Sequence, residues 1–330
     1  MKLPVRIAGL GWYLPARRVT SAELEAQLNI PSGWVERTTG VRERRYATAE
    51  TSVSMGVAAA RMALARAGLA PADLDAIIGA SSAPQQAIPC TAALIQRELG
   101  APDGASACFD VNATCLSFLV ALQAAAHLVA GGLYRRVLIV SSELASRSLN
   151  PLEWESAVLF GDAAAAAIIT PAAPQESSAI WHSQVVTYSS GADLTCLLGG
   201  GTLHHPNDPQ TTPVMNMFHM DGPAVFKKAT RLIGPFLENF FTQLAWTKSQ
   251  VNLVVPHQAS RHGVELLTAR LGFQPEQVFL NLPERGNCIS ASIPLALGEA
   301  HDAGRVQRGD RVVLVGSGAG LTFGALALTF

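Results

Sequence analysis

Three residues combine a reactive side chain with a place where folds commonly put catalytic groups. Cys115 directly precedes the apolar stretch Leu116–Ala130, which predicts a thiol at a helix N-terminus, where the macrodipole stabilises a thiolate. His257 follows the apolar run Val251–Val255, so we expect it at the carboxyl end of a buried strand. Asn287 precedes a second apolar helix. A thiol, an imidazole and an amide that converge on one pocket can perform nucleophilic catalysis.

Each of these residues also has an ordinary structural explanation. A free cysteine is usually a small buried hydrophobe, and a lone histidine at a strand end is often a core residue bonded to a backbone carbonyl. Asn287 follows Gly286, so it also fits a Gly-Asn turn that caps a helix. The other four cysteines have weaker claims to a chemical role; they are Cys90, Cys108, Cys196 and Cys288.

An internal repeat favours the catalytic interpretation. Residues 73–81 resemble 250–258, residues 114–122 resemble 287–295, and residues 134–140 resemble 309–315, in the same order and at offsets close to 175. We infer two similar halves, residues 1–172 and 173–330. The middle pair aligns Cys115 with Cys288 and puts Cys115 and Asn287 at equivalent helix starts. Packed about a pseudo-twofold axis, two such starts meet near the centre of the molecule.

The elements that must position these residues alternate between strands and helices, which predicts an α/β fold. Short β-branched runs predict buried strands at 6–9, 76–79, 137–141, 164–170, 251–255 and 312–315. Apolar residues at helical spacing predict helices over 53–67, ending at Gly68, over 116–130, and from Asp221 to about Leu244.

Composition excludes several classes of protein. The 330 residues are 49% hydrophobic and 15% charged, with a net charge of −1, which argues against disorder and against a nucleic-acid binder. Sparse charge predicts a surface covered by another subunit. Five cysteines without a C-x-x-C pair favour a reducing cytoplasm over a disulfide framework or zinc site. No signal peptide or membrane insertion is expected, and we expect no metal at His204-His205.

Several motifs, taken in order, resemble one known family. They are W-V-E-R-T-T-G-V-R-E-R-R (34–45), F-G-D-A-A-A-A (160–166), V-V-P-H-Q-A-S (254–260), G-N-C-I-S-A-S-I-P-L-A-L (286–297) and G-S-G-A-G-L-T-F-G (316–324). The whole chain resembles the thiolase superfamily, and within it the β-ketoacyl-acyl carrier protein synthase III branch. The resemblance implies a duplicated, five-layered αβαβα fold, a homodimer and a Cys115–His257–Asn287 triad.

The resemblance also implies a reaction. Cys115 would take an acyl group from an acyl thioester, with the backbone N–H groups of Cys115 and Ala319 binding the oxyanion. His257 and Asn287 would then assist decarboxylative condensation with a malonyl thioester. The substrates are acyl-CoA or acyl carrier protein, and no cofactor is expected. The last glycine-rich loop lacks the second cysteine of degradative thiolases and the G-K-[ST] ending of a phosphate-binding loop.

Other positions concern the substrate and the partner protein. Trp34 matches a tryptophan that stacks on the CoA adenine, with Arg37 next to the family's usual arginine position. Trp154-Glu155 stands where the family has Arg-Gly, and Ser317 replaces a common aromatic residue. Ile88 matches a residue that closes the acyl tunnel of the partner subunit. Residues expected to dock an acidic carrier protein, unless they form an ordinary solvated helix face, are Arg261, His262 and Arg270.

Two other functions stay open at this point. A relative in specialised metabolism would move the acyl group to an oxygen or nitrogen nucleophile, or would use a longer primer; Trp154-Glu155 and Ser317 motivate this alternative. A non-catalytic partner subunit is a third possibility, but such subunits typically lose the nucleophile, and all three triad residues are present here. The sequence does not specify the acyl chain, the acyl donor or the acceptor atom.

Overall fold

The structure of the protein, a computed structural model, describes residues 2–330 and contains two main sheets. The first sheet has the order β1 (Val5–Tyr13), β7 (Ala163–Pro171), β6 (Val137–Glu143), β4 (Ala76–Gly79) and β5 (Ala107–Asp110). The second has the order β8 (Ala179–Gly191), β13 (Gly320–Thr329), β12 (Arg311–Gly318) and β11 (Leu253–Pro256).

The two sheets repeat one topology. In the first sheet β1 and β7 are antiparallel, β7 and β6 are antiparallel, and β6 and β4 are parallel. The second sheet has the same sequence of pairings in β8, β13, β12 and β11. A parallel bridge from Val254 to Val278 lies where β5 lies in the first sheet. The internal repeat is therefore visible in the strand order, while the boundary between residues 172 and 173 stays a prediction.

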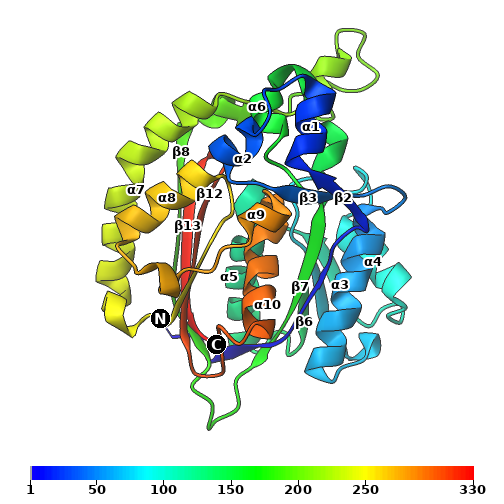
Figure 1. Ribbon diagram of the computed structural model, residues 1–330. Coiled ribbons are helices and arrows are strands. Elements are labelled where there is room, and N and C mark those ends of the chain that lie inside the picture. The colour runs from blue at the N-terminus through cyan, green and yellow to red at the C-terminus, as the bar shows by residue number, and fades with distance from the viewer. Residues whose placement is uncertain (1) are drawn as a thin grey trace.

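Helices cover both faces of both sheets and give five layers (Figure 1). Between the sheets lie α5 (Ser117–Ala130) and α10 (Ser292–Asp302). Outside the first sheet lie α3 (Ser52–Ala67) and α4 (Thr91–Leu99), and outside the second lie α7 (Gly222–Leu244) and α8 (Arg261–Leu271). The αβαβα architecture confirms the predicted fold class.

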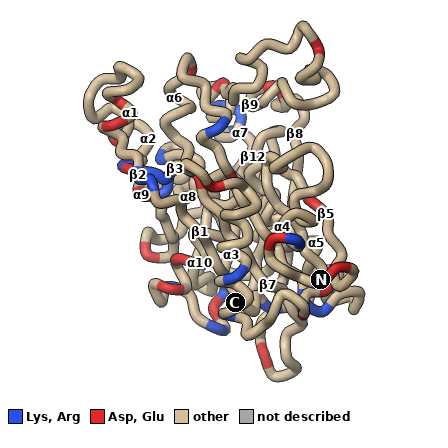
Figure 2. Tube along the Cα trace, turned by 90° about the vertical axis from the view of Figure 1, so that its right-hand side faces the viewer, with Lys and Arg blue, Asp and Glu red and all other residues tan. Residues whose placement is uncertain are grey.

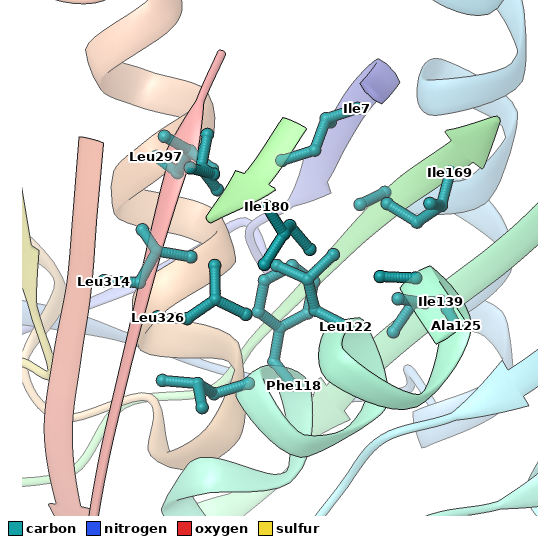
Figure 3. Packing of buried hydrophobic residues seen from close by; sticks show 14 of the residues in the cluster. Ile7, Phe118, Leu122, Ala125, Ile139, Ile169, Ile180, Leu297, Leu314 and Leu326 are labelled. Carbon is teal, nitrogen blue, oxygen red and sulfur yellow. The ribbon is translucent and has the colours of Figure 1, made fainter. Parts of the chain in front are cut away.

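The central layer holds the largest part of the core. Phe118 and Leu122 of α5 are almost completely buried and pack toward Ile139 of the first sheet and toward Leu314 and Leu326 of the second (Figure 3). Because α5 contacts both sheets, it carries apolar residues around most of its circumference. The segments that begin this helix and α10 are thereby fixed in the centre of the molecule.

The predicted helix ends follow their local sequence signals. The Thr51 hydroxyl accepts a hydrogen bond from the Ser54 N–H and starts α3, and Gly68 ends that helix with a φ of 66°. Asp221 caps α7 by accepting from the N–H of Ala224. The strand predicted at 251–255 begins two residues later, at Leu253.

Two excursions complete the chain. Residues 17–46 form the hairpin β2 (Arg17–Thr20) and β3 (Glu43–Tyr46), with α1 (Ser21–Leu28) and α2 (Trp34–Thr39) between its strands. The largely irregular segment 191–220 contains the short pair β9 (Thr195–Cys196) and β10 (His219–Met220). Two helices of four residues, α6 (Trp154–Ala157) and α9 (Leu282–Arg285), lead toward the candidate site.

Charged residues lie mainly at the periphery of the fold (Figure 2), with lysines and arginines near α2 and α7. Within residues 2–330, no helix has the length and apolar content needed to cross a membrane.

Candidate active site

A tight turn presents Cys115 at the start of the central helix α5. The turn is the 3-10 segment η2 (Thr114–Leu116), and Thr114 has a φ of 53°, which non-glycine residues adopt infrequently. The Asn112 side-chain oxygen accepts from the Thr114 N–H at 2.9 Å. The Ser117 hydroxyl accepts from the Ala113 N–H at 2.9 Å and donates to the Thr114 carbonyl at 2.7 Å. These bonds hold the cysteine in a defined orientation.

The Cys115 sulfur faces two backbone donors, its own N–H and that of Ala319. Ala319 reaches it because Gly318 approaches the turn closely: a Cβ on Gly318 would lie 2.7 Å from Oγ1 of Thr114. Burial, and after it the carboxylate of Glu143, raises the pKa of Cys115 to about 12. The two N–H groups lower the pKa of Cys115, as expected at a helix start, but desolvation outweighs them and the net shift is upward.

Asn287 begins a second turn of the same construction. The 3-10 segment η9 (Ile289–Ala291) precedes α10, and Ile289 has a φ of 51°. The Asn287 side-chain oxygen accepts from the Ile289 N–H at 2.9 Å, and the Ser292 hydroxyl accepts from the Cys288 N–H at 3.0 Å. Each bond has its counterpart around Cys115.

The equivalence of the two turns corrects the alignment made from sequence. Every matching feature lies 175 residues apart, so Ser290 and not Cys288 is the counterpart of Cys115. Asn287 likewise corresponds to Asn112, three residues before Cys115. The sequence alignment paired Cys288 with Cys115 because their residue types match. The feature that the two halves share is the backbone turn, and it pairs Cys115 with Ser290.

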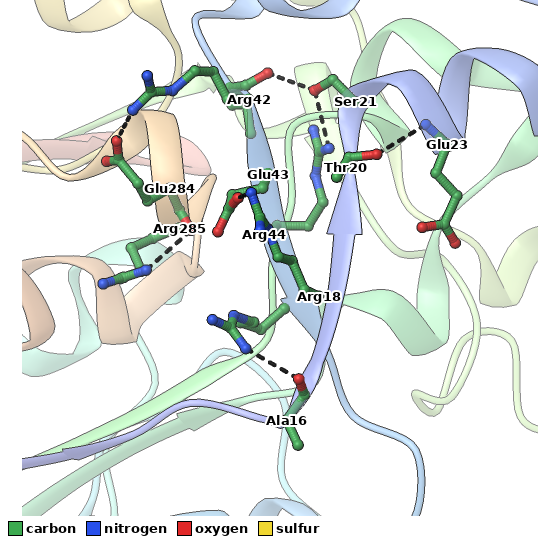
Figure 4. A network of polar contacts seen from close by, with 12 residues as sticks. Ala16, Arg18, Thr20, Ser21, Glu23, Arg42, Glu43, Arg44, Glu284 and Arg285 are labelled. Atoms are coloured by element: carbon green, nitrogen blue, oxygen red, sulfur yellow. Dashed lines mark hydrogen bonds and ion pairs between the residues drawn. The ribbon is translucent and has the colours of Figure 1, made fainter.

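The position of Asn287 depends on the segment that follows α6. Its N–H donates to the Leu159 carbonyl at 2.8 Å, and its carbonyl accepts from the Gly161 N–H at 3.1 Å. The preceding carbonyl, that of Val158, accepts from the guanidinium of Arg44 at 2.6 Å. Arg44 is fully buried in β3, and its other contact is the Ser21 hydroxyl at 3.1 Å (Figure 4). Through Arg44, the hairpin of residues 17–46 thus holds in place the segment that bonds to Asn287.

His257 lies at the carboxyl end of β11, as expected. Its N–H donates to the Val315 carbonyl of β12 at 2.8 Å, and its side chain is 4% exposed. Its Nδ1 is buried and has no hydrogen-bond partner among residues 2–330. Burial lowers the pKa of His257 to about 4, so the imidazole is neutral near pH 7.

Glycines at the end of β12 bring the three residues together. A Cβ on Gly316 would lie 2.5 Å from Cβ of His257 and 3.3 Å from Leu116, the neighbour of Cys115. The Asn287 amide donates to the Ala259 carbonyl at 3.4 Å, two residues beyond His257. The turn η2 also packs against η9 and β12. The segments that carry a thiol, a neutral imidazole and a carboxamide therefore converge between the two sheets, at the start of the two central helices.

The positions expected to bind substrate lie on several different elements. Trp34 and Trp154 contact each other edge to face, with ring centroids 4.6 Å apart. The Arg37 side chain donates to the Ser32 carbonyl at 3.3 Å, on the surface of α2. Ser317 pairs with Phe323 between β12 and β13, and Ile88 is 83% exposed.

The three residues expected to dock a carrier protein are all exposed on α8, but Arg270 lies apart from Arg261 and His262. Arg261 donates to the Arg37 carbonyl at 3.0 Å and so joins α8 to α2. His262 follows it, and its ring approaches Phe226 of α7 with centroids 6.5 Å apart. Arg270 lies nine residues further along α8, about 13.5 Å from Arg261 along the helix axis.

Sequence reasoning missed Glu143, Ser290 and Asn112. Ser290 donates a hydrogen bond to the buried carboxylate of Glu143. The internal repeat in the sequence identifies Ser290 and Asn112 when one offset of 175 residues is used for all of its segments. Glu143 carried no signal, because a lone glutamate after an apolar strand does not reveal that it is buried.

Comparisons with known proteins agree with this geometry. Residues 109–189 match the family 3-Oxoacyl-[acyl-carrier-protein (ACP)] synthase III, and residues 241–330 match its C-terminal counterpart. A β-ketoacyl-[acyl-carrier-protein] synthase III of Symbiobacterium thermophilum is 40% identical over 328 residues, which cover 98% of each chain. The chain belongs to the β-ketoacyl-acyl carrier protein synthase III family.

Two solved structures share the whole architecture. The 3-oxoacyl-[acyl-carrier-protein] synthase III of Aquifex aeolicus is 33% identical, with a TM-score of 0.89 over 99% of this chain and 100% of that one. The priming β-ketosynthase of the R1128 polyketide biosynthetic pathway is 31% identical, with a TM-score of 0.90 over 98% of this chain and 95% of that one. The synthase III fold thus extends over both halves of the chain.

Proposed function

We propose that the protein is a condensing enzyme that loads an acyl group onto Cys115 and joins it to a malonyl thioester with loss of CO₂. The observation that carries this proposal is the convergence of Cys115, between two backbone donors, with a neutral His257 and the Asn287 amide. Membership of the synthase III family supports the same reaction.

In the first half-reaction, the Cys115 sulfur attacks the carbonyl carbon of an acyl thioester. The carbonyl oxygen becomes an oxyanion. The backbone N–H groups of Cys115 and Ala319, which face the sulfur, would donate hydrogen bonds to this oxyanion. The bond from carbon to the donor sulfur then breaks, and the thiol proton passes to the departing thiolate by way of the His257 imidazole. The products are acyl-Cys115 and a free thiol.

In the second half-reaction, a malonyl thioester takes the place of that thiol. Its bond to the carboxylate breaks and releases CO₂, and the electron pair forms an enolate. His257 in its neutral Nε2–H form and the Asn287 amide donate to the enolate oxygen. The enolate carbon attacks acyl-Cys115, the carbon–sulfur bond breaks, and the released Cys115 thiolate takes up one proton. The product is a β-ketoacyl thioester.

The acyl donor and the partners belong to the same proposal. Arg261 and His262 at the start of α8 would contact an acidic carrier protein, whereas Arg270 would lie at the edge of that contact. A second copy of the chain would receive the exposed Ile88 in its acyl tunnel. The direct contact between Trp34 and Trp154 favours a carrier protein over CoA as the donor, because the two indoles already pack on each other.

Release of CO₂ from malonyl-carrier protein, measured with and without an acyl donor, tests this function. The wild-type protein should release CO₂ and form a β-ketoacyl thioester. The variant Asn287→Asp keeps an oxygen for the Ile289 N–H but loses the amide donor, so condensation should fall at least about 100-fold while acylation of Cys115 continues. Acylation without malonyl-dependent CO₂ release in the wild-type protein would contradict condensation and favour transfer to an oxygen or nitrogen nucleophile.

A further inference from the structure

The last residue of β6, Glu143, is a buried carboxylate that the proposed mechanism does not use. It is 2% exposed and accepts three hydrogen bonds. The Ser82 N–H donates at 2.6 Å, the Ser82 hydroxyl donates at 2.7 Å, and the Ser290 hydroxyl also donates. Among residues 2–330, no lysine, arginine or histidine forms an ion pair with it. Burying a carboxylate that is hydrogen-bonded only by neutral donors costs folding free energy, which indicates that Glu143 has a functional role.

The bonds of Glu143 connect the two equivalent turns. Ser290 is the counterpart of Cys115 in the second half, so one bond leads directly to the turn of Asn287. Ser82 leads to the other turn, because its carbonyl accepts from the Asn112 amide at 2.9 Å. The oxygen of that amide in turn accepts from the Thr114 N–H, next to Cys115. One carboxylate therefore bridges the supports of the nucleophile and of the amide.

The charge of Glu143 also reaches the nucleophile. The titratable groups that its carboxylate acts on are Cys115 and Cys288, and in both it raises the pKa of the thiol. Burial raises the pKa of Glu143 itself to about 7, opposed by the hydrogen bonds from Ser290 and Ser82. His257 stays neutral over this range because burial lowers its pKa to about 4. The carboxylate near Cys115 thus changes charge close to neutral pH.

We propose that Glu143 is a positioning residue that ties the two turns together and whose negative charge adds to burial in holding the resting Cys115 as a thiol. The proposal rests on the proposed function in one respect, that Cys115 is the nucleophile. A thiol held in this form resists alkylation and oxidation between turnovers. During turnover its proton passes to His257 once a thioester occupies the site.

The rate of alkylation of Cys115 by iodoacetamide, followed by peptide mass spectrometry as a function of pH, tests the proposal. This rate reports the thiolate fraction and needs neither an acyl donor nor malonyl thioester, so it is independent of the condensation assay. In the wild-type protein the rate should rise with pH, flatten near pH 7 as Glu143 ionises, and then rise again. In Glu143→Gln the flat region should disappear, and above pH 8 alkylation should be several-fold faster than in the wild type, because the charge that raises the pKa of the thiol is gone.

Two further variants keep the test decisive if Glu143→Gln does not fold. Ser290→Ala removes a donor that lowers the pKa of Glu143, so the flat region should move to higher pH. Asp162→Asn is the matched control. Asp162 is a fully buried carboxylate bonded to Ser146 and Ala47, and it is not among the groups that shift the pKa of Cys115.

The Asp162→Asn profile should coincide with that of the wild type. The proposal is overturned if the Glu143→Gln profile overlays that of the wild type, if Ser290→Ala leaves the flat region unmoved, or if Asp162→Asn accelerates alkylation as Glu143→Gln does.

Discussion

At the scale of single residues, the site keeps its reactive groups uncharged until substrate arrives. The thiol of Cys115 has a raised pKa and the imidazole of His257 a lowered one, and burial is the main cause of both shifts. A permanent thiolate–imidazolium pair is therefore not the resting state. Neutral groups suit a reaction whose charge appears on an oxyanion and then on an enolate, because both anions need hydrogen-bond donors.

The buried imidazole predicts a specific dependence of stability on pH. The pKa of His257 is about 4 in the folded protein and 6.5 in the unfolded chain, so between these values the unfolded state binds more protons. Stability should therefore fall as pH decreases from 6.5 toward 4, by about 2 kcal/mol from this group at pH 5. Urea unfolding at pH 8 and pH 5 should show this loss in the wild type and not in His257→Gln. Equal losses in both proteins would contradict the assigned pKa.

Residue types and motif order were sufficient to select Cys115, His257 and Asn287 from the sequence. The charge states were not predictable, because they depend on burial and on Glu143. This residue is 28 positions from Cys115 in sequence, and only the fold brings its charge within reach of the thiol. The macrodipole argument considered one favourable contribution and omitted the larger cost of desolvation. Ser82 and Arg44, which also support the site, were missed because their contacts form only in the fold, whereas Ser290 was missed because the repeat was aligned with the wrong offset.

At the scale of elements, paired strand ends and turns place the site. The end of β12 passes so close to β11 and η2 that only glycine fits at Gly316. Strand positions such as Ala76–Gly79 were predicted well, because β-branched runs bounded by turns identify them. The hairpin of residues 17–46 was not predicted, since its strands are four residues long and strongly charged.

A methyl group at Gly316 tests this close approach. Gly316→Ala should destabilise the protein by about 1–3 kcal/mol and reduce condensation, because the new Cβ would lie 2.5 Å from Cβ of His257. Gly201→Ala in the exposed segment 191–220 is the matched control. Apart from its chain neighbours, the new Cβ meets no atom within 4 Å, so stability should change by less than about 0.5 kcal/mol. Denaturant unfolding measures both, and equal effects of the two substitutions would contradict the packing of β12 against His257.

At the scale of the whole molecule, duplication explains why the site is central. Two copies of one topology pack their α5 and α10 helices back to back, so the turns that start these helices face each other. One turn supplies a thiol and the other an amide. The alternation of strands and helices predicted the α/β class, and the family resemblance implied the five layers. The offset of 175 became certain only from the matching turns.

The central helix should be the most sensitive part of the core. Leu122 on α5 is 1% exposed between the two sheets (Figure 3), so Leu122→Ala should cost about 2–5 kcal/mol of unfolding free energy. Leu133 is 65% exposed, and Leu133→Ala should change it by less than about 0.5 kcal/mol. Chemical denaturation of both variants compares them directly. A small effect at Leu122 would contradict a closely packed central layer.

The most direct test of the account is the intact mass of the protein after exposure to acyl-CoA and acyl-carrier-protein donors, without malonyl thioester. The account predicts a mass increase of one acyl group, located by peptide mapping on Cys115, and no increase in Cys115→Ala. Subsequent malonyl-carrier protein should remove the adduct from the wild-type protein. Absence of any adduct, or an adduct that persists in Cys115→Ala, would contradict Cys115 as the nucleophile.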